Sequence, residues 1–359
     1  MKFFNIDLHI SIIADMKKIF NDIGHEVFDL SLSEHTWVFN RVKDSVPMLD
    51  NSRWMSLSPE QFSEEFYEYR ENEHLKDADA FIVTYPPTFS LLYKKYKKPI
   101  IINNPIRYEW PFSFRTKDWN YFNDYLRDGV DNGFIYLVAN NLYDKYYMEH
   151  FIEREVEHIP SICDYYKTYY TENDNSFLYY SRDKVTEFTN PKISYKDDLY
   201  SKHTHFDLVK HRGIIHLPYQ ISYMSIFEQY TSNIPLFIPT KELLFDIYKT
   251  KKYNVLKEVS WNGYFNQVSK SFINYKGKHD PNNYLDLESV EFWIQYADFY
   301  DSDWMPHIIY FSSLEELNTL VDTVDVNDIS NKMKSFNKLR TQKIYDMWSS
   351  LINKINKSK

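Results

Sequence analysis

One stretch of the sequence combines hydroxyl, carboxylate and aromatic side chains at spacings that suit a bound nucleotide. Residues 216–239 read HLPYQISYMSIFEQYTSNIPLFIP, a pattern typical of a strand, a proline-bounded loop, a helix and a second strand. The helix N-terminus would offer backbone N–H groups and about half a positive charge to a pyrophosphate. Ser222 or Ser225 would add a hydroxyl there, and Glu228 would bind the two hydroxyls of a ribose. In the alternative interpretation Ser222 is an ordinary N-cap and Glu228 an ordinary solvated residue.

Three further groups of side chains have the chemistry of metal ligands. They are Asp301-Ser302-Asp303, Asp77-Ala78-Asp79, and His203 and His205 with His211 nearby. Carboxylate pairs coordinate hard cations, but such pairs arise easily in a chain rich in aspartate. No carboxylate or cysteine at matching spacing completes the histidine set. We therefore expect a capping role for Asp303 and no metal site.

The elements that must position these residues alternate between apolar strands and amphipathic helices in the first half of the chain. Continuous apolar strands separated by helices are typical of a parallel sheet covered on both faces, so we expect a Rossmann-like domain. Gly24 is expected to end the first helix as its C-cap. The strands are predicted at 2–8, 26–30, 80–84, 99–102 and 133–138, and the helices at 12–23, 89–96, 117–130 and 141–151.

After a predicted hinge at 157–166 the same pattern begins again. Strands are expected at 177–180, 213–217, 234–239 and 306–311, and helices at 222–230, 241–253, 313–321 and 327–355. We predict an N-terminal domain over 1–160, a second Rossmann-like domain over 161–330, and a C-terminal helix over 331–359 that packs back on the first domain. Ligands of open α/β sheets bind beyond the carboxyl ends of the strands, so the two domains are expected to face each other across a functional cleft.

Composition excludes several other classes of protein. The net charge is −9 and the aromatic content is 18%, with only six glycines. An acidic chain without a basic stripe is a poor nucleic-acid binder, and no GxGxxG or Walker A motif is present. Cys163 is the single cysteine, which favours a reducing compartment. Asp7 interrupts any N-terminal signal sequence, and no apolar run approaches the ~18–20 residues of a membrane helix, so we expect a cytoplasmic protein.

The 216–239 segment resembles the donor-nucleotide site of GT-B glycosyltransferases, in which a helix start and a glutamate precede a proline-containing strand. The resemblance implies that Glu228 grips the donor ribose and that Tyr219, Ser222 and Ser225 line the donor site. Retaining members carry a first Glu where Gln220 stands here. Residues 177–182 (FLYYSR) are similar to the first strand of the donor domain, which ends in a Gly-Arg pair at the diphosphate. Ser181 replaces that glycine, and Arg182 keeps the arginine.

The same resemblance implies roles in the N-terminal half. Many inverting GT-B enzymes place a general base just past the first strand, where His9 stands, and Asp7 would orient it. The alternative is a structural histidine at a strand end. The acceptor would bind His35 and Trp37 in one loop and Arg107 and Tyr108 in another, with Glu109 as a further catalytic candidate. The alternative for that second loop is an internal Arg–Glu pair.

The chain as a whole resembles the divergent glycosyltransferases of large DNA viruses and bacteria. It is therefore expected to be a metal-independent, inverting enzyme that moves a hexosyl or pentosyl group from a nucleotide-sugar to a glycan or other hydroxyl acceptor. UDP is the first expectation for the nucleotide and GDP the second, with no cofactor. The alternative is a non-catalytic nucleotide- or carbohydrate-binding protein of the same fold, because Gln220 and Ser181 depart from the enzyme pattern.

Overall fold

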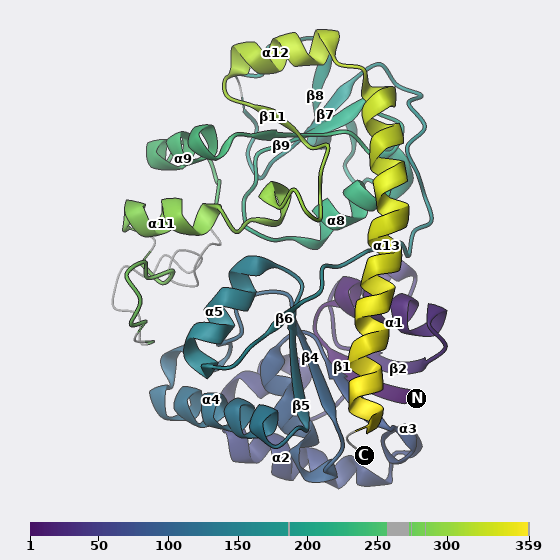
Figure 1. Ribbon diagram of the computed structural model, residues 1–359, viewed down its shortest axis with the longest axis vertical. Helices are drawn as coiled ribbons and strands as arrows, with labels where there is room; N and C mark the ends of the chain where they lie inside the picture. The colour runs from purple at the N-terminus through teal and green to yellow at the C-terminus, as the bar shows by residue number, and fades with distance from the viewer. Residues whose placement is uncertain (186, 257–272, 274, 284, 358–359) are drawn as a thin grey trace. The chain divides into compact units, whose positions relative to one another are not determined.

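The computed structural model describes residues 1–359 except 186, 257–272, 274, 284 and 358–359 (Figure 1). The described chain divides into two compact units. The first comprises the described residues of Met1–Ser161 and Ile344–Lys359 together with Ile273, and the second those of Ile162–Ser271 and Tyr275–Lys343. Each unit is an α/β domain built on its own parallel sheet.

In the described part of the first unit, six parallel strands form one sheet in the order β2-β1-β3-β4-β5-β6. The central strands are buried along their whole length, because helices cover both faces of the sheet and apolar side chains fill both interfaces. The strands are β1 (Lys2–Asp7), β2 (Glu26–Ser31), β3 (Ala80–Val83), β4 (Ile100–Asn104), β5 (Ile135–Ala139) and β6 (Glu157–His158).

The helices of the first unit follow the apolar periodicity of the sequence. In α1, Ile12, Met16 and Ile19 form one buried stripe, and the chain leaves this helix through Gly24 at φ +86°, which a side chain would strain. The α-helices are α1 (Ile10–Asp22), α2 (Pro59–Phe66), α3 (Glu73–Asp77), α4 (Thr116–Asp131) and α5 (Leu142–Ile152). The 3-10 helices are η1 (Thr36–Phe39), η2 (Asp50–Ser56), η3 (Tyr67–Glu71), η4 (Pro87–Tyr96) and η5 (Phe112–Phe114).

The segment predicted as a hinge is partly a strand. Glu157 and His158 pair with Val138 and Ala139, which makes β6 the edge strand of the first sheet. Two residues are too few to show a strand periodicity, so only the neighbouring β5 identifies them as part of the sheet. The first unit ends just after them, at Ser161.

In the described part of the second unit, five parallel strands have the order β11-β10-β9-β7-β8. Gly213 begins β9, where an added Cβ would lie 2.8 Å from the Pro235 carbonyl oxygen. The strands are β7 (Phe177–Tyr180), β8 (Ile193–Tyr195), β9 (Gly213–His216), β10 (Leu236–Pro239) and β11 (Ile309–Phe311). The helices are α6 (Lys196–Leu199), α7 (His205–Leu208), α8 (Met224–Thr231), α9 (Lys241–Thr250), α11 (Leu287–Ile294), η6 (Asp298–Tyr300) and α12 (Leu314–Thr323).

Both sheets are doubly wound with one shared strand order. When the strands of each unit are numbered along the chain, their order across the sheet begins 2-1-3-4-5, which is the flavodoxin-like order. The connections on either side of the first strand therefore run in opposite senses. This switch point lies between β1 and β3 in the first unit and between β7 and β9 in the second. Ligands of such sheets bind at the carboxyl ends of the strands beside the switch point.

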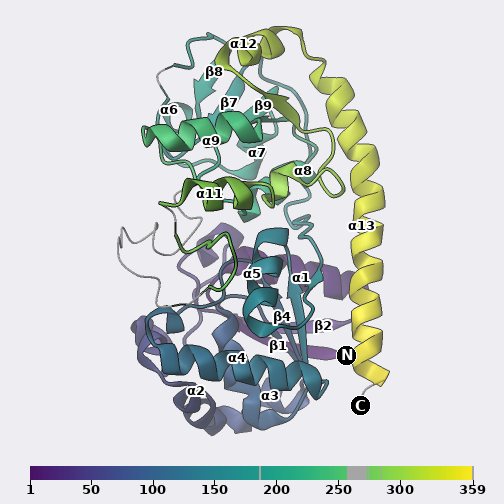
Figure 2. The ribbon, with the colours of Figure 1, turned by 60° about the vertical axis from the view of Figure 1, so that its left-hand side comes forward.

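The long C-terminal helix α13 (Val326–Lys357) is confirmed and contributes to both units. Figure 2 shows α13 as one continuous helix. Within the first unit Trp348 is 1% exposed, and its ring centroid lies 5.3 Å from that of Phe20 on α1. Within the second unit Asn337 and Arg340 of the same helix are buried. Among the described residues, no helix combines the length and the apolar character that crossing a membrane requires.

Candidate functional site

The switch point of the second unit brings Arg182 and Tyr219 together. Tyr180 ends β7 and His216 ends β9, so the loops that follow them leave the same edge of the sheet. The Arg182 guanidinium lies over the Tyr219 ring at 4.1 Å from its centroid. An arginine stacked on an exposed edge is a cation held in a fixed direction, which suits a phosphate.

Ser181 is buried and shapes the turn that carries Arg182. Its Oγ accepts the backbone N–H of Asp183 at 3.3 Å. The Asp183 carboxylate in turn accepts the backbone and side-chain N–H groups of Asn254. The loop after β7 is thus anchored at both of these positions.

The helix predicted from Ser222 begins later, at Met224. Tyr223 is the N-cap and makes no side-chain capping bond, so the expectation that Ser222 caps the helix is wrong. The Ser222 hydroxyl instead donates to the carboxylate of Asp298, which is 5% exposed. Asp298 lies 76 residues away in the chain, so no local pattern could reveal this bond. Ser225 is half-buried in the first turn of α8.

Glu228 is half-buried on α8, and its Oε1 accepts a hydrogen bond from the Tyr165 hydroxyl. Burial, with the neighbouring Cys163 and Glu228, raises the pKa of Tyr165 well above its usual value. Burial and the Glu228 charge also raise the pKa of Tyr166. The carboxylate is therefore oriented by a phenol that remains protonated. Sequence reasoning missed both tyrosines, because they lie in the segment interpreted as a hinge, over 60 residues from Glu228.

His216 supports the site from behind. It is buried at the end of β9, where its Nε2 and the Gln229 Oε1 lie 2.7 Å apart and its Nδ1 and the Tyr223 hydroxyl lie 3.2 Å apart. Because Gln229 Oε1 only accepts, Nε2 carries the proton and Nδ1 accepts from the tyrosine. Burial lowers the pKa of His216 to about 4, so the ring is neutral. These bonds fix the start of α8 against β9.

The switch point of the first unit is occupied by Asp7. Its carboxylate is buried and accepts hydrogen bonds from Ser31 Oγ at 2.8 Å and Thr84 Oγ1 at 3.4 Å. Ser31 ends β2 and Thr84 follows β3, so three neighbouring strand ends converge on one carboxyl group. Burial raises the pKa of Asp7 to about 7, although the Ser31 hydrogen bond opposes this rise.

His9 is the N-cap residue of α1, two residues beyond Asp7. Its Nδ1 is buried and has no hydrogen-bond partner within the described part of the chain. Burial lowers the pKa of His9 to about 4, and the nearby His35 lowers it further. The hydrogen bonds of the Asp7 carboxylate go to Ser31 and Thr84, so the structure does not bear out Asp7 as the group that orients His9.

His35 and Trp37 are exposed on the loop after β2. His35 is the N-cap residue of η1, and Trp37 is 60% exposed. The charge of His35 contributes to the lowered pKa of His9, after burial. An exposed indole beside a strand edge suits a sugar ring, which stacks on aromatic faces.

Arg107, Tyr108 and Glu109 lie in the interior, against the expectation that they meet an acceptor. Arg107 is 2% exposed and Glu109 1% exposed, and the two form an ion pair. The Arg107 guanidinium lies 3.8 Å from the Tyr147 ring centroid, and Nη2 donates to the Tyr147 hydroxyl at 2.7 Å. Burial raises the pKa of Glu109, and Arg107 opposes the rise. The sequence shows that these three residues are polar or aromatic, but it does not show that tyrosines of α5 enclose them. We therefore withdraw the acceptor role of Arg107 and Tyr108 and the catalytic role of Glu109.

The residues considered as metal ligands have other partners. The Asp301 carboxylate accepts the Asp303 backbone N–H at 3.1 Å and so stabilises a turn, and no helix begins at Asp303, so the expected capping role of Asp303 is wrong. His205 lies 2.6 Å from the Ser232 hydroxyl, while His211 lies between Ser176 and Tyr200. Within the described part of the chain, no group of three or more His, Cys, Asp or Glu side chains has the geometry of a metal site.

Comparison with known proteins gives structural matches only. No protein family and no curated protein matches the sequence. Similar solved structures include the glycosyltransferase SnogD from Streptomyces nogalater, with 8% identity, a TM-score of 0.45, and coverage of 98% of this chain and 99% of that chain. The UGT73P12 structure from Glycyrrhiza uralensis, complexed with glycyrrhetinic acid 3-O-monoglucuronide, has 11% identity, a TM-score of 0.45, and coverage of 100% and 96%.

A third match is the S. aureus MnaA–UDP co-structure, with 13% identity, a TM-score of 0.38, and coverage of 74% of this chain and 86% of that chain. At identities and TM-scores this low, none of these matches shows what the chain binds or does.

Proposed function

We propose that the chain is a metal-independent glycosyltransferase of the GT-B type, which moves a sugar from a nucleoside diphosphate sugar to a hydroxyl acceptor with inversion. The observation that supports this most directly is the edge at the β7–β9 switch point. There a stacked arginine, a helix start and a tyrosine-anchored carboxylate belong to one unit. These groups match the diphosphate and the ribose of a nucleotide.

In the proposed donor complex each group has one task. Arg182 pairs with the diphosphate, and Ser225 with the backbone N–H groups of the first turn of α8 adds hydrogen bonds to it. Tyr219 offers its ring for stacking. Glu228 accepts hydrogen bonds from the ribose hydroxyls, oriented by Tyr165. UDP is the nucleotide we propose first and GDP second, with a glycan as the acceptor.

The proposed reaction is a single displacement at the anomeric carbon. The acceptor oxygen forms the new glycosidic bond as the bond to the diphosphate breaks, and the electron pair of that bond leaves with the diphosphate. Arg182 and the α8 N-terminus stabilise the leaving group as its negative charge grows. The acceptor proton passes to a base in the first unit, for which we propose His9, with Trp37 and His35 beside the acceptor.

Asp7 is the second candidate for the base. His9 is neutral near pH 7 and ready to accept a proton, but a pKa of about 4 makes it a weak base. Asp7, at about 7, is better matched to neutral pH, although its carboxyl is fully buried. This weak basicity of His9 also favours a second function, that of a nucleotide- or carbohydrate-binding protein without turnover.

A nucleotide screen followed by a turnover assay tests the proposal. UDP or GDP at 100 times its Kd should stabilise the chain by roughly 2.7 kcal/mol, read as a rise in Tm. The matching nucleotide-sugar should then release nucleoside diphosphate, with or without EDTA. Binding without release supports the second function. Loss of turnover in EDTA with rescue by Mn²⁺ contradicts metal independence, and no Tm rise with any nucleoside diphosphate overturns the proposal altogether.

Substitution of His9 separates the base from a structural histidine. We expect His9→Ala to lower kcat by about 10²–10⁴-fold, the usual contribution of general base catalysis, with an unchanged donor Kd. Asp7→Asn is the companion variant that tests the second candidate. A His9→Ala protein that melts normally and turns over at the wild-type rate removes His9 from the mechanism.

A further inference from the structure

A cavity of about 630 Å³ lies in the second unit at the C-terminal end of α8. Thr231 ends α8 and Asn233 follows it, whereas Arg182, Tyr219 and Ser225 lie before or in the first turn of α8, and Glu228 lies one turn before Thr231. Ser225 and Thr231 are about 9 Å apart along the helix axis, so the cavity is separate from the proposed diphosphate end of the donor site. The cavity is lined by Asp164, Tyr169, Tyr170, Thr171, Thr231, Asn233, Asn327, Ser330, Asn331, Lys334, Asn337, Lys338 and Thr341.

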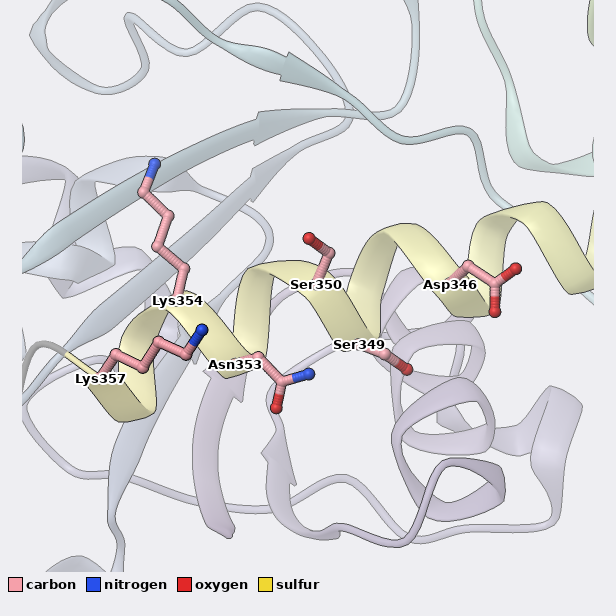
Figure 3. A pocket seen from close by; sticks show the side chains of 6 residues that line it. All are labelled: Asp346, Ser349, Ser350, Asn353, Lys354 and Lys357. Atoms are coloured by element: carbon pink, nitrogen blue, oxygen red, sulfur yellow. The ribbon is translucent and has the colours of Figure 1, made fainter.

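This cavity differs from the polar hollow at the C-terminal end of α13. That hollow, of about 610 Å³, is lined by side chains of one helix, which project from its surface and enclose nothing (Figure 3). The α8 cavity instead takes its lining from three segments: the 164–171 loop, the end of α8 and the N-terminal half of α13. Binding sites for small molecules are concave and are usually lined by several segments of the chain.

Asn337 supplies a buried acceptor that the described residues do not use. It is 7% exposed, and its Nδ2 donates to the Tyr230 carbonyl oxygen and to Asn233 Oδ1, both at 2.9 Å. These two bonds fix the orientation of the amide. Its Oδ1 is buried without a hydrogen-bond partner in the described part of the chain. An unsatisfied buried acceptor costs free energy, so this position calls for a donor such as a ligand hydroxyl.

The charges around the cavity favour an anion. Lys334 and Lys338 are four residues apart on α13, so both stand on one helix face at the cavity. No carboxylate forms an ion pair with either lysine in the described part of the chain. Asp164 brings the one carboxylate of the lining, and its Oδ1 accepts the Tyr169 hydroxyl at 3.0 Å. Within the lining, two ammonium groups therefore outnumber one partnered carboxylate, while Glu172 beside it accepts a hydrogen bond from Asn327 and pairs with Arg212.

The remaining lining is made of amides, hydroxyls and tyrosine rings rather than aliphatic side chains. Amide and hydroxyl groups pair with ligand hydroxyls, and Tyr169, at 48% exposure, offers a ring face for stacking.

We propose that this cavity binds an anionic carbohydrate, meaning a sugar that carries a carboxylate or a phosphate. Its hydroxyls satisfy Asn337 Oδ1 and the neighbouring amides, and its charge pairs with Lys334 and Lys338. A cavity of about 630 Å³ accommodates one or two sugar rings. The proposal does not depend on the glycosyltransferase activity, because none of these residues belongs to the candidate donor site.

Calorimetric titration of the full chain with three sugars tests the proposal. The probes are glucuronate, glucose 6-phosphate and glucose, each titrated with and without saturating UDP. Both anionic probes should bind at least about tenfold more tightly than glucose, because charge-assisted hydrogen bonds are the stronger ones. The tighter of the two identifies the preferred anionic group. Displacement of either anionic probe by UDP would show that the probe binds at the donor edge, and this would overturn the proposal. The absence of saturable binding would overturn it too.

Matched variants locate the site. Lys334→Gln combined with Lys338→Gln should reduce the affinity for both anionic probes to that for glucose. Lys332→Gln, on the same helix but paired with Asp328 and outside the lining, should bind like the wild type. Asn337→Ala, checked by its Tm, should weaken all three sugars by about fivefold, the loss of one hydrogen bond. Unchanged affinities in the double lysine variant would overturn the proposal even if Asn337→Ala fails to fold.

Discussion

At the scale of single residues, burial has moved two neighbouring ionisable groups in opposite directions. It raises the pKa of Asp7 to about 7 and lowers that of His9 to about 4. Both changes disfavour the charged form, because a charge loses its hydration when buried. Near neutral pH the carboxyl is at its titration point and the imidazole is neutral. The pKa values of Asp7 and His9 are thus set mainly by their burial at the end of β1.

The pH dependence of stability isolates Asp7. Between about pH 4 and pH 7 an unfolded chain has ionised this aspartate while the folded chain keeps it protonated, so stability falls as pH rises through that window. Asp7→Asn removes the effect. We expect the variant to gain on the order of 2–4 kcal/mol over the wild type between pH 4 and pH 8.

Denaturant unfolding at both pH values measures this difference. Asp77→Asn is the control, because its side chain is 67% exposed and its substitution should change little. An equal effect of Asp7→Asn at both pH values would show that the carboxyl titrates normally.

Glu228 makes a separate prediction about the ribose. Glu228→Gln keeps an acceptor for Tyr165 but removes the charge, so the fold should persist while UDP affinity falls by about 1.5–3 kcal/mol, the usual contribution of a charged hydrogen bond. Affinities for UDP and 2′-deoxy-UDP, measured by calorimetry, provide the readout, since only the wild type should discriminate between them. Glu242→Gln, exposed in the first turn of α9, is the matched control. Undiminished discrimination in Glu228→Gln would place the ribose elsewhere.

At the scale of elements, doubly wound topology determines where function can lie. Parallel strands leave their loops on one edge, and opposite crossovers separate two of those loops at the switch point. In the second unit these loops carry Arg182 and Tyr219, and in the first unit Asp7 ends β1 and Thr84 begins the loop after β3. The two sheets therefore present their polar side chains at corresponding positions of one strand order.

The loop after β7 predicts a preference for diphosphates. Arg182→Gln should weaken UDP by about tenfold or more and UMP by much less, because a guanidinium pairs most strongly with the additional phosphate charge. Lys184→Gln changes a neighbouring cation that already pairs with Asp198, so its affinities should stay at wild-type values. Titration of both nucleotides into each variant gives the comparison. Equal losses for UDP and UMP would show that Arg182 does not meet the second phosphate.

At the scale of the whole molecule, α13 is a single helix whose two halves belong to different units. Its buried side chains are anchored separately in each unit, by Trp348 against Phe20 in the first and by Asn337 and Arg340 near Tyr230 in the second. The described C-terminal part of α13, up to Ile355, thus contributes buried side chains to the first unit.

Truncation of Trp348 should therefore destabilise the first unit. Trp348→Ala removes a fully buried indole, a loss worth about 3–5 kcal/mol, and should lower the urea midpoint of that unit. Nucleotide affinity, a property of the second unit in our proposal, should be unchanged under native conditions. Leu339→Ala, with 72% of the side chain exposed on the same helix, is the control. An unaltered urea midpoint would show that α13 is not needed by the first unit.

The sequence by itself determined the two parallel sheets, most of their strands and the long C-terminal helix, but not the short edge strands β6 and β8 or helices such as α2 and α11. Apolar runs such as Ile100–Ile102 and the stripe of α1 are local patterns, and backbone geometry converts them into strands and helices at periods of 2 and 3.6. Placing Arg182, Tyr219, Asp7 and His9 at strand ends followed from the same patterns. Their roles remain proposals.

The tertiary structure decided which polar groups face one another and which are buried. Ser222 meets Asp298, Glu228 meets Tyr165, and Arg107 turns inward with Glu109, although each looked equally accessible in the sequence. The first two pairings join residues tens of positions apart, and the third depends on tyrosines of α5 that enclose it. Hydrogen bonding and desolvation depend on what covers a side chain in space, and that covering comes from distant elements whose packing no local pattern encodes.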